Sequence, residues 1–222
     1  MNKQFENAAP EDLLTWAWQT FNGQLAITSS FQTQSVPLLH MIARLIPELP
    51  ILFIDTGFHF PETLAFRHSL AEEYSLNVID VKPQWTREQF AAEYGELYKV
   101  DPDLCCRLNK VEPLETALAN YKAWLTGIRR DQTKTRSQSC IVAWLPHLNI
   151  YKINPLANWT AADVNTYIEK HDLPVHPLWD QGYRSIGCAP CTAPISAQQD
   201  ERAGRWPGME KSECGLHIHP VE

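Results

Sequence analysis

The 222-residue sequence lacks any run of eighteen apolar residues, so we expect no membrane-spanning helix. Its first residues, MNKQFENAAPEDLL, also lack the apolar stretch of a signal peptide. We therefore expect a cytoplasmic protein, in which paired cysteines more often bind metal or carry out redox chemistry than form disulfides. A net charge of −7 argues against general nucleic-acid binding.

The pattern of short apolar runs predicts one α/β domain. The chain is 44% hydrophobic, which is enough for one core, and it contains no internal repeat. Strands that alternate with helices imply a mainly parallel, Rossmann-like sheet covered on both faces. Pro, Gly and Cys dominate beyond Asp172, where we expect loops. We expect the domain to span residues 1–195 and an irregular C-terminal segment to span residues 196–222. The predicted strands are 24–28, 50–56, 76–81, 121–128 and 149–153, and the predicted helices are 35–46, 61–74, 86–95, 111–118 and 160–171.

Several helix starts carry local signals. Pro37 and Pro61 suit the first turns of their helices, because a missing N–H costs nothing there. Thr86 and Thr160 are predicted caps, and Asp163 is placed to complete a capping box with Thr160.

Four of the six cysteines stand in two pairs. Cys105 and Cys106 are adjacent, and Cys188 and Cys191 form a Cys-x-x-Cys loop, which lets two sulfurs face one metal centre. Adjacent side chains tend to diverge, so they suit the separate iron corners of a [4Fe–4S] cluster better than one tetrahedral zinc ion. Zinc, a disulfide and a purely structural role remain alternatives. Cys140 has apolar neighbours and is predicted to be a small core residue.

Cys214 differs from these pairs because basic residues gather near it. Arg202, Arg205 and Lys211 precede it, and positive charge favours the thiolate, the nucleophilic form of cysteine. Cys214 is therefore a candidate nucleophile that the C-terminal segment delivers to a bound electrophile, with an inert terminal cysteine as the alternative. A second basic cluster, residues 129–136, suggests an anionic small-molecule ligand, although solvated surface charges explain it equally well.

Residues 29–35, SSFQTQS, join a predicted strand to a predicted helix. Such turns lie where ligands bind in parallel sheets, and a helix N-terminus favours phosphate. The turn corresponds in position to the Ser-Gly-Gly-x-Asp-Ser loop of ATP pyrophosphatases, but Phe31 and Gln32 replace the glycines and Gln34 replaces the Asp, a Mg²⁺ ligand. We expect nucleotide binding here without ATP cleavage; an ordinary helix cap is the alternative.

Six stretches, spread over most of the chain, form one pattern: SSFQTQ (29–34), DTGFHFPET (55–63), CCRLNKVEPL (105–114), GIRRDQTKTR (127–136), PLWDQGYRSIGCAPCT (177–192) and ECGLH (213–217). Together and in this order they resemble the assimilatory sulfonucleotide reductases, which reduce adenylyl sulfate or its 3′-phosphorylated form. The cluster-bearing branch, which typically uses adenylyl sulfate, is the closer match. The resemblance implies a fold of the ATP-pyrophosphatase type.

The resemblance also implies a role for each motif. Cys214 is implied as the nucleophile that attacks the sulfate sulfur, displaces AMP and becomes S-sulfonated. Thioredoxin or glutaredoxin then attacks this intermediate and releases sulfite. The implied ligands of a [4Fe–4S] cluster are Cys105, Cys106, Cys188 and Cys191. The implied substrate-binding residues are Ser29, Ser30, Asp55, Thr56, Gly57, Lys110, Arg136, Arg202 and Arg205.

Other functions stay open at this stage. The Ser-Ser-Phe loop is also familiar among reductases of phosphoadenylyl sulfate, so the same Cys214 chemistry on that substrate is the first alternative. An ATP-dependent thiolation or adenylation enzyme is the second, although the missing loop Asp disfavours pyrophosphate release. A zinc-stabilised binding module without catalysis is the third. The sequence does not fix the oligomeric state, and a homo-oligomer is compatible with it.

Overall fold

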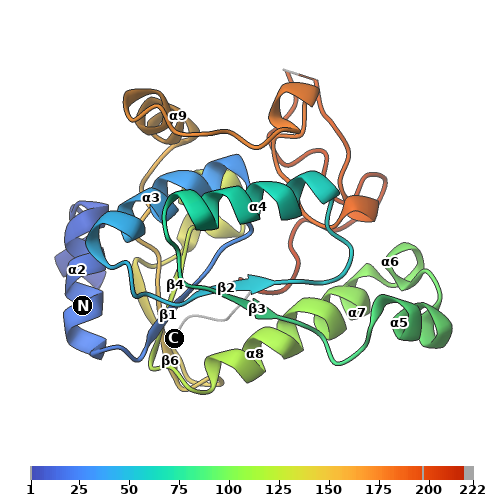
Figure 1. Ribbon diagram of the computed structural model, residues 1–222, viewed down its shortest axis with the longest axis horizontal. Coiled ribbons are helices and arrows are strands. Elements are labelled where there is room, and N and C mark those ends of the chain that lie inside the picture. Colours follow the sequence, from blue (N-terminus) through green and yellow to red (C-terminus); the bar gives the residue numbers. More distant parts are fainter. Residues whose placement is uncertain (1, 197, 218–222) are drawn as a thin grey trace.

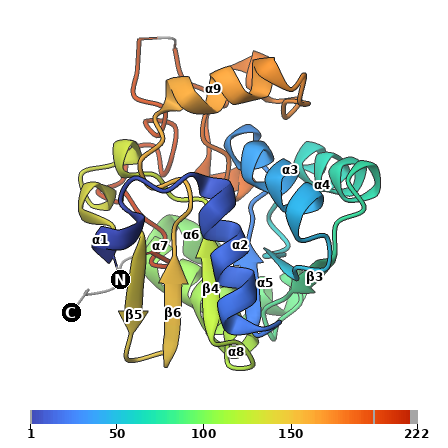
Figure 2. The ribbon, with the colours of Figure 1, turned by 90° about the vertical axis from the view of Figure 1, so that its left-hand side faces the viewer.

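A six-stranded sheet forms the centre of the computed structural model, which describes residues 2–196 and 198–217 (Figures 1 and 2). The strand order is β3-β2-β1-β4-β6-β5; the first five strands run parallel, and β5 pairs antiparallel with β6 at one edge. The strands are β1 (Leu25–Thr28), β2 (Ile51–Ile54), β3 (Val78–Val81), β4 (Ala123–Thr126), β5 (Val142–Leu145) and β6 (Ile150–Ile153).

Helices fill most connections between the strands. The α-helices are α1 (Asn2–Phe5), α2 (Pro10–Phe21), α3 (Val36–Leu45), α4 (Pro61–Glu73), α5 (Arg87–Tyr94), α6 (Leu97–Val100), α7 (Pro102–Cys106), α8 (Glu112–Leu118) and α9 (Ala161–Lys170). One π-helical turn, η2 (Arg107–Val111), joins α7 to α8. Short 3₁₀ turns are η1 (Thr33–Ser35), η3 (Arg130–Gln132), η4 (Arg136–Gln138), η5 (Trp179–Gln181) and η6 (Ala189–Cys191).

Alternate side chains of the strands build a core on each face of the sheet. In β1, Leu25 and Ile27 belong to one core and Ala26 to the other. The first core packs against α2, α3, α4 and α9, and the second packs against Leu114 and Leu118 of α8. Because both faces are covered, the strands appear in the sequence as continuous apolar runs.

All five predicted strands are confirmed as β1, β2, β3, β4 and β6, so the predicted mainly parallel sheet is confirmed. The sequence analysis did not predict β5, although it lies in the apolar run 140–145, because periodicity alone does not assign a short apolar run to a strand. It also did not predict α2. The helix predicted at 111–118 was too short, since the helical stretch already begins at Pro102 and carries Cys105 and Cys106.

The local signals predicted at four helix starts are confirmed. The Gln89 N–H donates to Thr86 Oγ1 at 3.2 Å, and the Asp163 N–H donates to Thr160 Oγ1 at 3.2 Å. Pro37 lies in the first turn of α3, and Pro61 begins α4. After α9, the described part of the chain contains loops and 3₁₀ turns, as predicted. The boundary at residue 195 stays a prediction, and residues 218–222 of the C-terminal segment lie outside the described residues.

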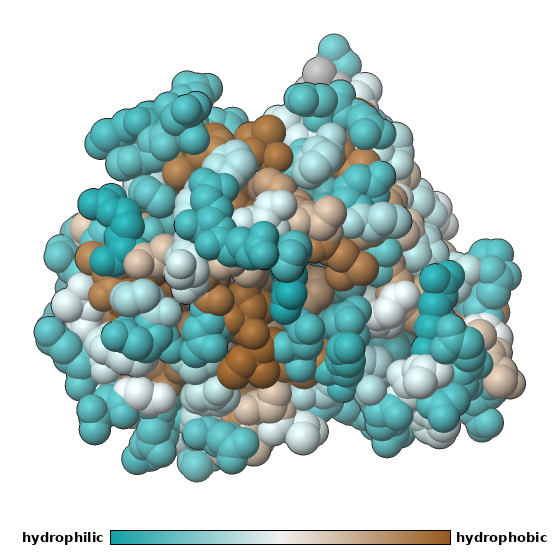
Figure 3. Space-filling model, in the orientation of Figure 1, coloured by the Kyte–Doolittle hydropathy of each residue, from teal (hydrophilic) through white to brown (hydrophobic). Residues whose placement is uncertain are grey.

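Within the described residues, no helix combines the length and the apolar character that a membrane span requires. Figure 3 shows a largely polar face with apolar atoms near its centre. Helix α4 and strand β3 lie on this face, and their Leu64 and Ile79 are 43% and 41% exposed. Scattered exposed apolar side chains of this kind are normal for globular proteins.

The strand order reverses between β1 and β4. From β1 the chain continues to β2 and β3 on one side, and it later returns to β4 on the other side of β1. Connections therefore diverge at the carboxyl ends of β1 and β4, which opens a crevice where open α/β sheets bind ligands.

Candidate active site

The turn after β1 holds a phenylalanine in a backbone conformation that favours glycine. Phe31 has a φ of 51°, in the left-handed region. Its ring is fully buried and meets the ring of Phe53 edge-on, with 5.7 Å between centroids. Its N–H donates to Ser29 Oγ at 3.2 Å. Burial of a large ring offsets the cost of this conformation, so the turn stays tight although its glycines are replaced.

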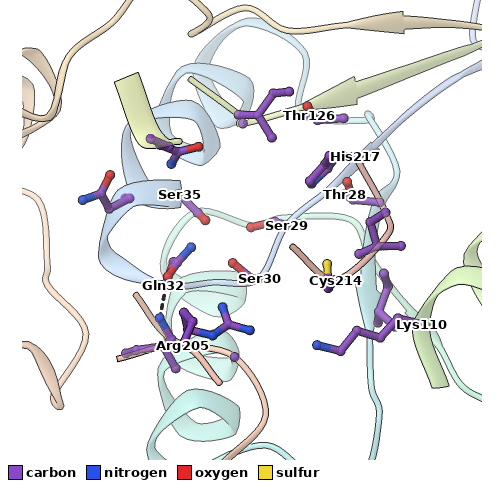
Figure 4. Close-up of a pocket in the computed structure, with 18 of the residues that line it drawn as sticks. Thr28, Ser29, Ser30, Gln32, Ser35, Lys110, Thr126, Arg205, Cys214 and His217 are labelled. Carbon is purple, nitrogen blue, oxygen red and sulfur yellow. Dashed lines mark hydrogen bonds between the residues drawn. The ribbon is translucent and has the colours of Figure 1, made fainter. Parts of the chain in front are cut away.

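A polar pocket opens at the carboxyl ends of β1, β2 and β4. It encloses about 1080 Å³ of empty space, its open mouth included. Figure 4 shows Cys214 between Ser29 and Ser30 on one side and Lys110 on the other. The predicted site residues that line this pocket are Ser29, Ser30, Lys110, Arg136, Arg202, Arg205 and Cys214. Four cations and a thiol in one crevice suit an anionic substrate that reacts with a sulfur nucleophile.

Lys110 reaches the pocket from the π-helical turn η2. Pro113 has no N–H to donate to the carbonyl of Asn109, so the regular helical hydrogen bonding is interrupted there. Asn109 is 3% exposed, and its Nδ2 donates to the Cys105 carbonyl at 3.0 Å. Single π turns inside helices are frequent at functional sites, and this one directs Lys110 toward Cys214.

Arg205 is held against the Cys-x-x-Cys loop. Its guanidinium lies 4.5 Å from the ring centroid of Trp206, which is 2% exposed. A Cβ atom at Gly187 would collide with the same guanidinium. Gly187 therefore leaves the room that Arg205 occupies at the pocket wall.

A second, smaller cavity shares Lys110 and Trp206 with the polar pocket. Its empty volume is about 360 Å³, and its lining includes no carboxylate. The four paired cysteines all line it: Cys105, Cys106, Cys188 and Cys191. Among residues 2–196 and 198–217, no three Cys, His, Asp or Glu side chains are arranged to hold a metal ion. Four sulfur atoms are spread over the wall of this cavity, in apolar surroundings.

Burial and charge act on the thiols in opposite directions. Burial raises the pKa of Cys105 to about 12 and that of Cys106 to about 11. At Cys188 burial also disfavours the thiolate, but the Lys110 charge and a 3.4 Å contact with Thr56 Oγ1 outweigh it and lower the pKa. Burial alone would lower the pKa of Lys110; the neighbouring sulfurs raise it instead. The sulfurs therefore favour the charged form of Lys110, which lines both cavities.

A family model described as the phosphoadenosine phosphosulfate reductase domain matches residues 24–194. The chain belongs to the sulfonucleotide reductase family. This reductase is 44% identical to adenosine 5′-phosphosulfate reductase of Streptomyces coelicolor, over 97% of this chain and 91% of the relative. It is 45% identical, with the same coverage of 97% and 91%, to phosphoadenosine 5′-phosphosulfate reductase of Gloeobacter violaceus.

The fold of the reductase agrees with a solved structure of the family. Phosphoadenylyl-sulfate reductase from Candida auris, in a phosphate complex, matches with a TM-score of 0.76 and 34% identity, over 86% of this chain and 94% of that one. The predicted family and the predicted ATP-pyrophosphatase-type fold are confirmed. The protein is accordingly an oxidoreductase acting on a sulfur group, and not a binding module.

Three residues predicted to bind the nucleotide lie elsewhere in the reductase. Asp55, Thr56 and Gly57 are not among the residues that line the polar pocket. Thr56 contacts Cys188 instead, and Asp55 Oδ1 accepts from the Gly57 N–H at 3.1 Å. Their assignment to the substrate stays a prediction.

Cys140 is half-buried and lines neither cavity, so its prediction as a core residue was wrong. It lies two residues before β5, and its carbonyl accepts from Asn154 Nδ2 at 2.7 Å.

Sequence reasoning did not predict the contacts that three charged residues make beside the pocket, because their partners are distant in the chain. Glu213 is 3% exposed and ion-paired with Arg136. Lys152 in β6 is 5% exposed, with Nζ 5.0 Å from the ring centroid of Trp124. Arg129 is 1% exposed and donates to Gln34, the residue in place of the loop Asp. Two of the three carried a sequence signal: Glu213 stands next to Cys214, and Arg129 belongs to the basic cluster 129–136.

Proposed function

We propose that this reductase converts adenosine 5′-phosphosulfate to sulfite and AMP, in assimilatory sulfate reduction, with a thioredoxin-class protein as reductant. The observation that carries this proposal is that the Cys214 thiol and four cations line one pocket at the switch point of the sheet. The name of the Streptomyces coelicolor relative supports the choice of substrate.

In the first step the Cys214 thiolate attacks the sulfate sulfur. An S–S bond forms, the S–O bond to the AMP phosphate breaks, and its electron pair leaves with AMP. The product on the enzyme is an S-sulfonated cysteine. Lys110 and Arg205 line the same pocket, so their charges neutralise the negative charge that grows on the departing phosphate.

In the second step a dithiol protein of the thioredoxin or glutaredoxin class attacks Cys214 Sγ. Sulfite leaves with the electron pair of the S–S bond, and a mixed disulfide remains. The second thiol of the partner resolves it, which restores Cys214 and supplies the two electrons of the reduction. All six cysteines are free thiols, which suits the reducing cytoplasm that we infer as the location.

We further propose that Cys105, Cys106, Cys188 and Cys191 hold a [4Fe–4S] cluster. Their shared, carboxylate-free cavity supports this ligand set, because thiolates are the usual ligands of such clusters. The two cysteine pairs lie in different elements of the fold. Cys105 and Cys106 end α7, whereas Cys188 precedes the turn η6 and Cys191 ends it. When bound, the cluster supplies a fixed charge beside Lys110 and takes no electrons from the steps above.

Mass spectrometry of the intact protein tests the proposed chemistry. After incubation with adenosine 5′-phosphosulfate and no reductant, we expect the wild type to gain the mass of one SO₃ group, mapped to Cys214, with one AMP released. Cys214→Ser should gain nothing and form no sulfite. Cys140→Ser is the matched control, because Cys140 lines neither cavity, and it should react like the wild type. A sulfonated Cys214→Ser protein would show that another residue is the nucleophile.

Phosphoadenosine 5′-phosphosulfate is the second candidate substrate. The name of the Gloeobacter violaceus relative and the Ser29-Ser30-Phe31 loop favour it. The ratio of kcat/KM for the two nucleotides decides, and a strong preference for the 3′-phosphate would replace our first choice.

A further inference from the structure

The carboxylate of Glu213 is bound by the side chains that were expected to bind substrate. Arg136 Nε donates to Glu213 Oε1 at 2.8 Å, and Arg136 Nη2 donates to Oε2 at 2.7 Å. Thr133 Oγ1 donates to Oε1 at 3.1 Å, and Arg202 Nη2 lies 3.3 Å from Oε2. This is a forked, charge-assisted arrangement of four donors on one buried carboxylate.

Glu213 is ionised in this setting. Burial alone would raise its pKa, but the hydrogen bonds and charges of Arg136 and Arg202 outweigh burial and hold the pKa below its ordinary value. Arg202 also donates through Nη2 to the Ser212 carbonyl at 2.8 Å, so the backbone next to Glu213 is fixed as well.

Cys214 follows Glu213 directly, and adjacent Cα atoms are about 3.8 Å apart. Because the Glu213 carboxylate is bound to the domain, the position of the Cys214 thiol, one residue further along the chain, is restricted as well. Beyond it, Gly215 has a φ of 88°, so the chain turns sharply just after the thiol. We propose that Glu213 is a positioning residue that docks Cys214 in the polar pocket through Arg136 and Arg202.

The docking contact divides the four cations of the pocket into two kinds. Arg136 and Arg202 are paired with Glu213. In the described part of the chain, Lys110 and Arg205 have no carboxylate within salt-bridge distance. The inference, which rests on the proposed function for this step, is that Lys110 and Arg205 meet the phosphosulfate while Arg136 and Arg202 hold the segment that carries the nucleophile.

The substitution Glu213→Gln removes the negative charge of the side chain and keeps its size and shape. With adenosine 5′-phosphosulfate in single turnover, we expect the rate of Cys214 sulfonation to fall at least tenfold. In a Cys214→Ser background, the affinity for AMP should stay equal or rise, because Glu213→Gln leaves two arginines uncompensated. The matched control is Glu210→Gln, an exposed carboxylate of the same segment, which should behave like the wild type. A wild-type rate in Glu213→Gln, or a loss of AMP affinity that accompanies the loss of rate, would overturn the proposal.

Amide hydrogen exchange tests docking without any reaction. In Glu213→Gln the amides of residues 206–217 should exchange faster than in the wild type, and those of the sheet should not change. Arg136→Lys keeps the positive charge but loses the paired hydrogen bonds to Glu213, so its amide exchange should increase in the same way. In the variant that combines both substitutions, the increase in exchange should only slightly exceed the larger of the two single increases. Unchanged exchange in both single variants contradicts docking by Glu213. Because this measurement needs no substrate, it stands even if the proposed reaction fails in the wild type.

Discussion

The two cavities share Lys110 and Trp206 but differ in their chemistry. The smaller one is lined by sulfur, rings and proline, with no carboxylate and with Lys110 as its one cation among the described residues. The larger one is lined by hydroxyls, amides and four cations around a single thiol. Sulfur is thus present in both, and its surroundings decide its role: four thiols in apolar surroundings suit soft metal ligation, whereas one thiol beside cations suits nucleophilic attack.

The difference also explains why one lysine belongs to both cavities. Lys110 is half-buried, and its charge is favoured by the sulfurs on one side while it faces the anion site on the other. A cation placed in this way couples the two cavities electrostatically, although their chemistry is separate. We therefore expect that replacing a ligand sulfur, replacing the shared lysine and replacing a more distant charged residue each change a different measurable property of the protein.

The largest expected effect comes from replacing one ligand sulfur. In Cys191→Ser the smaller cavity loses a thiolate, so we expect loss of the iron–sulfur absorption and of bound iron and sulfide, and with it the activity. Cys214→Ser is the opposite case and should retain iron and absorption while it forms no sulfite. Visible spectra and metal analysis after anaerobic purification separate the two. An intact spectrum in Cys191→Ser contradicts the proposed ligand set.

The shared lysine is expected to give the next largest effect. Lys110→Met removes the cation from both cavities but no sulfur, so the iron–sulfur absorption should persist. The single-turnover rate of Cys214 sulfonation should fall by roughly 10²- to 10³-fold, the cost typical of losing one charge-stabilising donor. Lys110→Arg should recover part of the rate because it keeps the charge. Equal rates in Lys110→Met and the wild type would remove Lys110 from the reaction.

The sequence predicted the members of both cavities better than their contacts. The cysteine pairs, Lys110 and the arginines are recognisable from motifs, and five of the six strands from apolar runs. The ion pair between Arg136 and Glu213 was not predictable, because the two residues are 77 positions apart and no sequence pattern links them. Phe31 shows the converse case: a glycine position of the related loop holds a bulky residue, and only the fold shows that burial of its ring makes this acceptable.

The smallest expected effect concerns Lys152, which is buried in β6 and sharpens the contrast with the half-buried Lys110. Burial and the nearby charge of Arg136 lower the pKa of Lys152 to about 7, while Cys214 and Glu213 act in the opposite direction. Below pH 7 the lysine is protonated in both the folded and the unfolded chain, and the cost of its buried charge is fully present. As the pH rises from 7 toward the ordinary lysine pKa, the unfolded state binds a proton that the folded state lacks, so the free energy of unfolding rises by about 1.4 kcal/mol per pH unit.

Lys152→Met removes this titration. The free energy of unfolding of the wild type, relative to Lys152→Met, should therefore increase by roughly 2–3 kcal/mol between pH 7 and pH 9, measured by urea denaturation of both proteins. Lys122→Met is the control for the substitution itself, because Lys122 is exposed. A pH-independent difference for Lys152→Met would mean that Lys152 keeps its charge in the folded protein. In that case the four paired cysteines would not be what distinguishes Lys110, in η2, from Lys152, in β6.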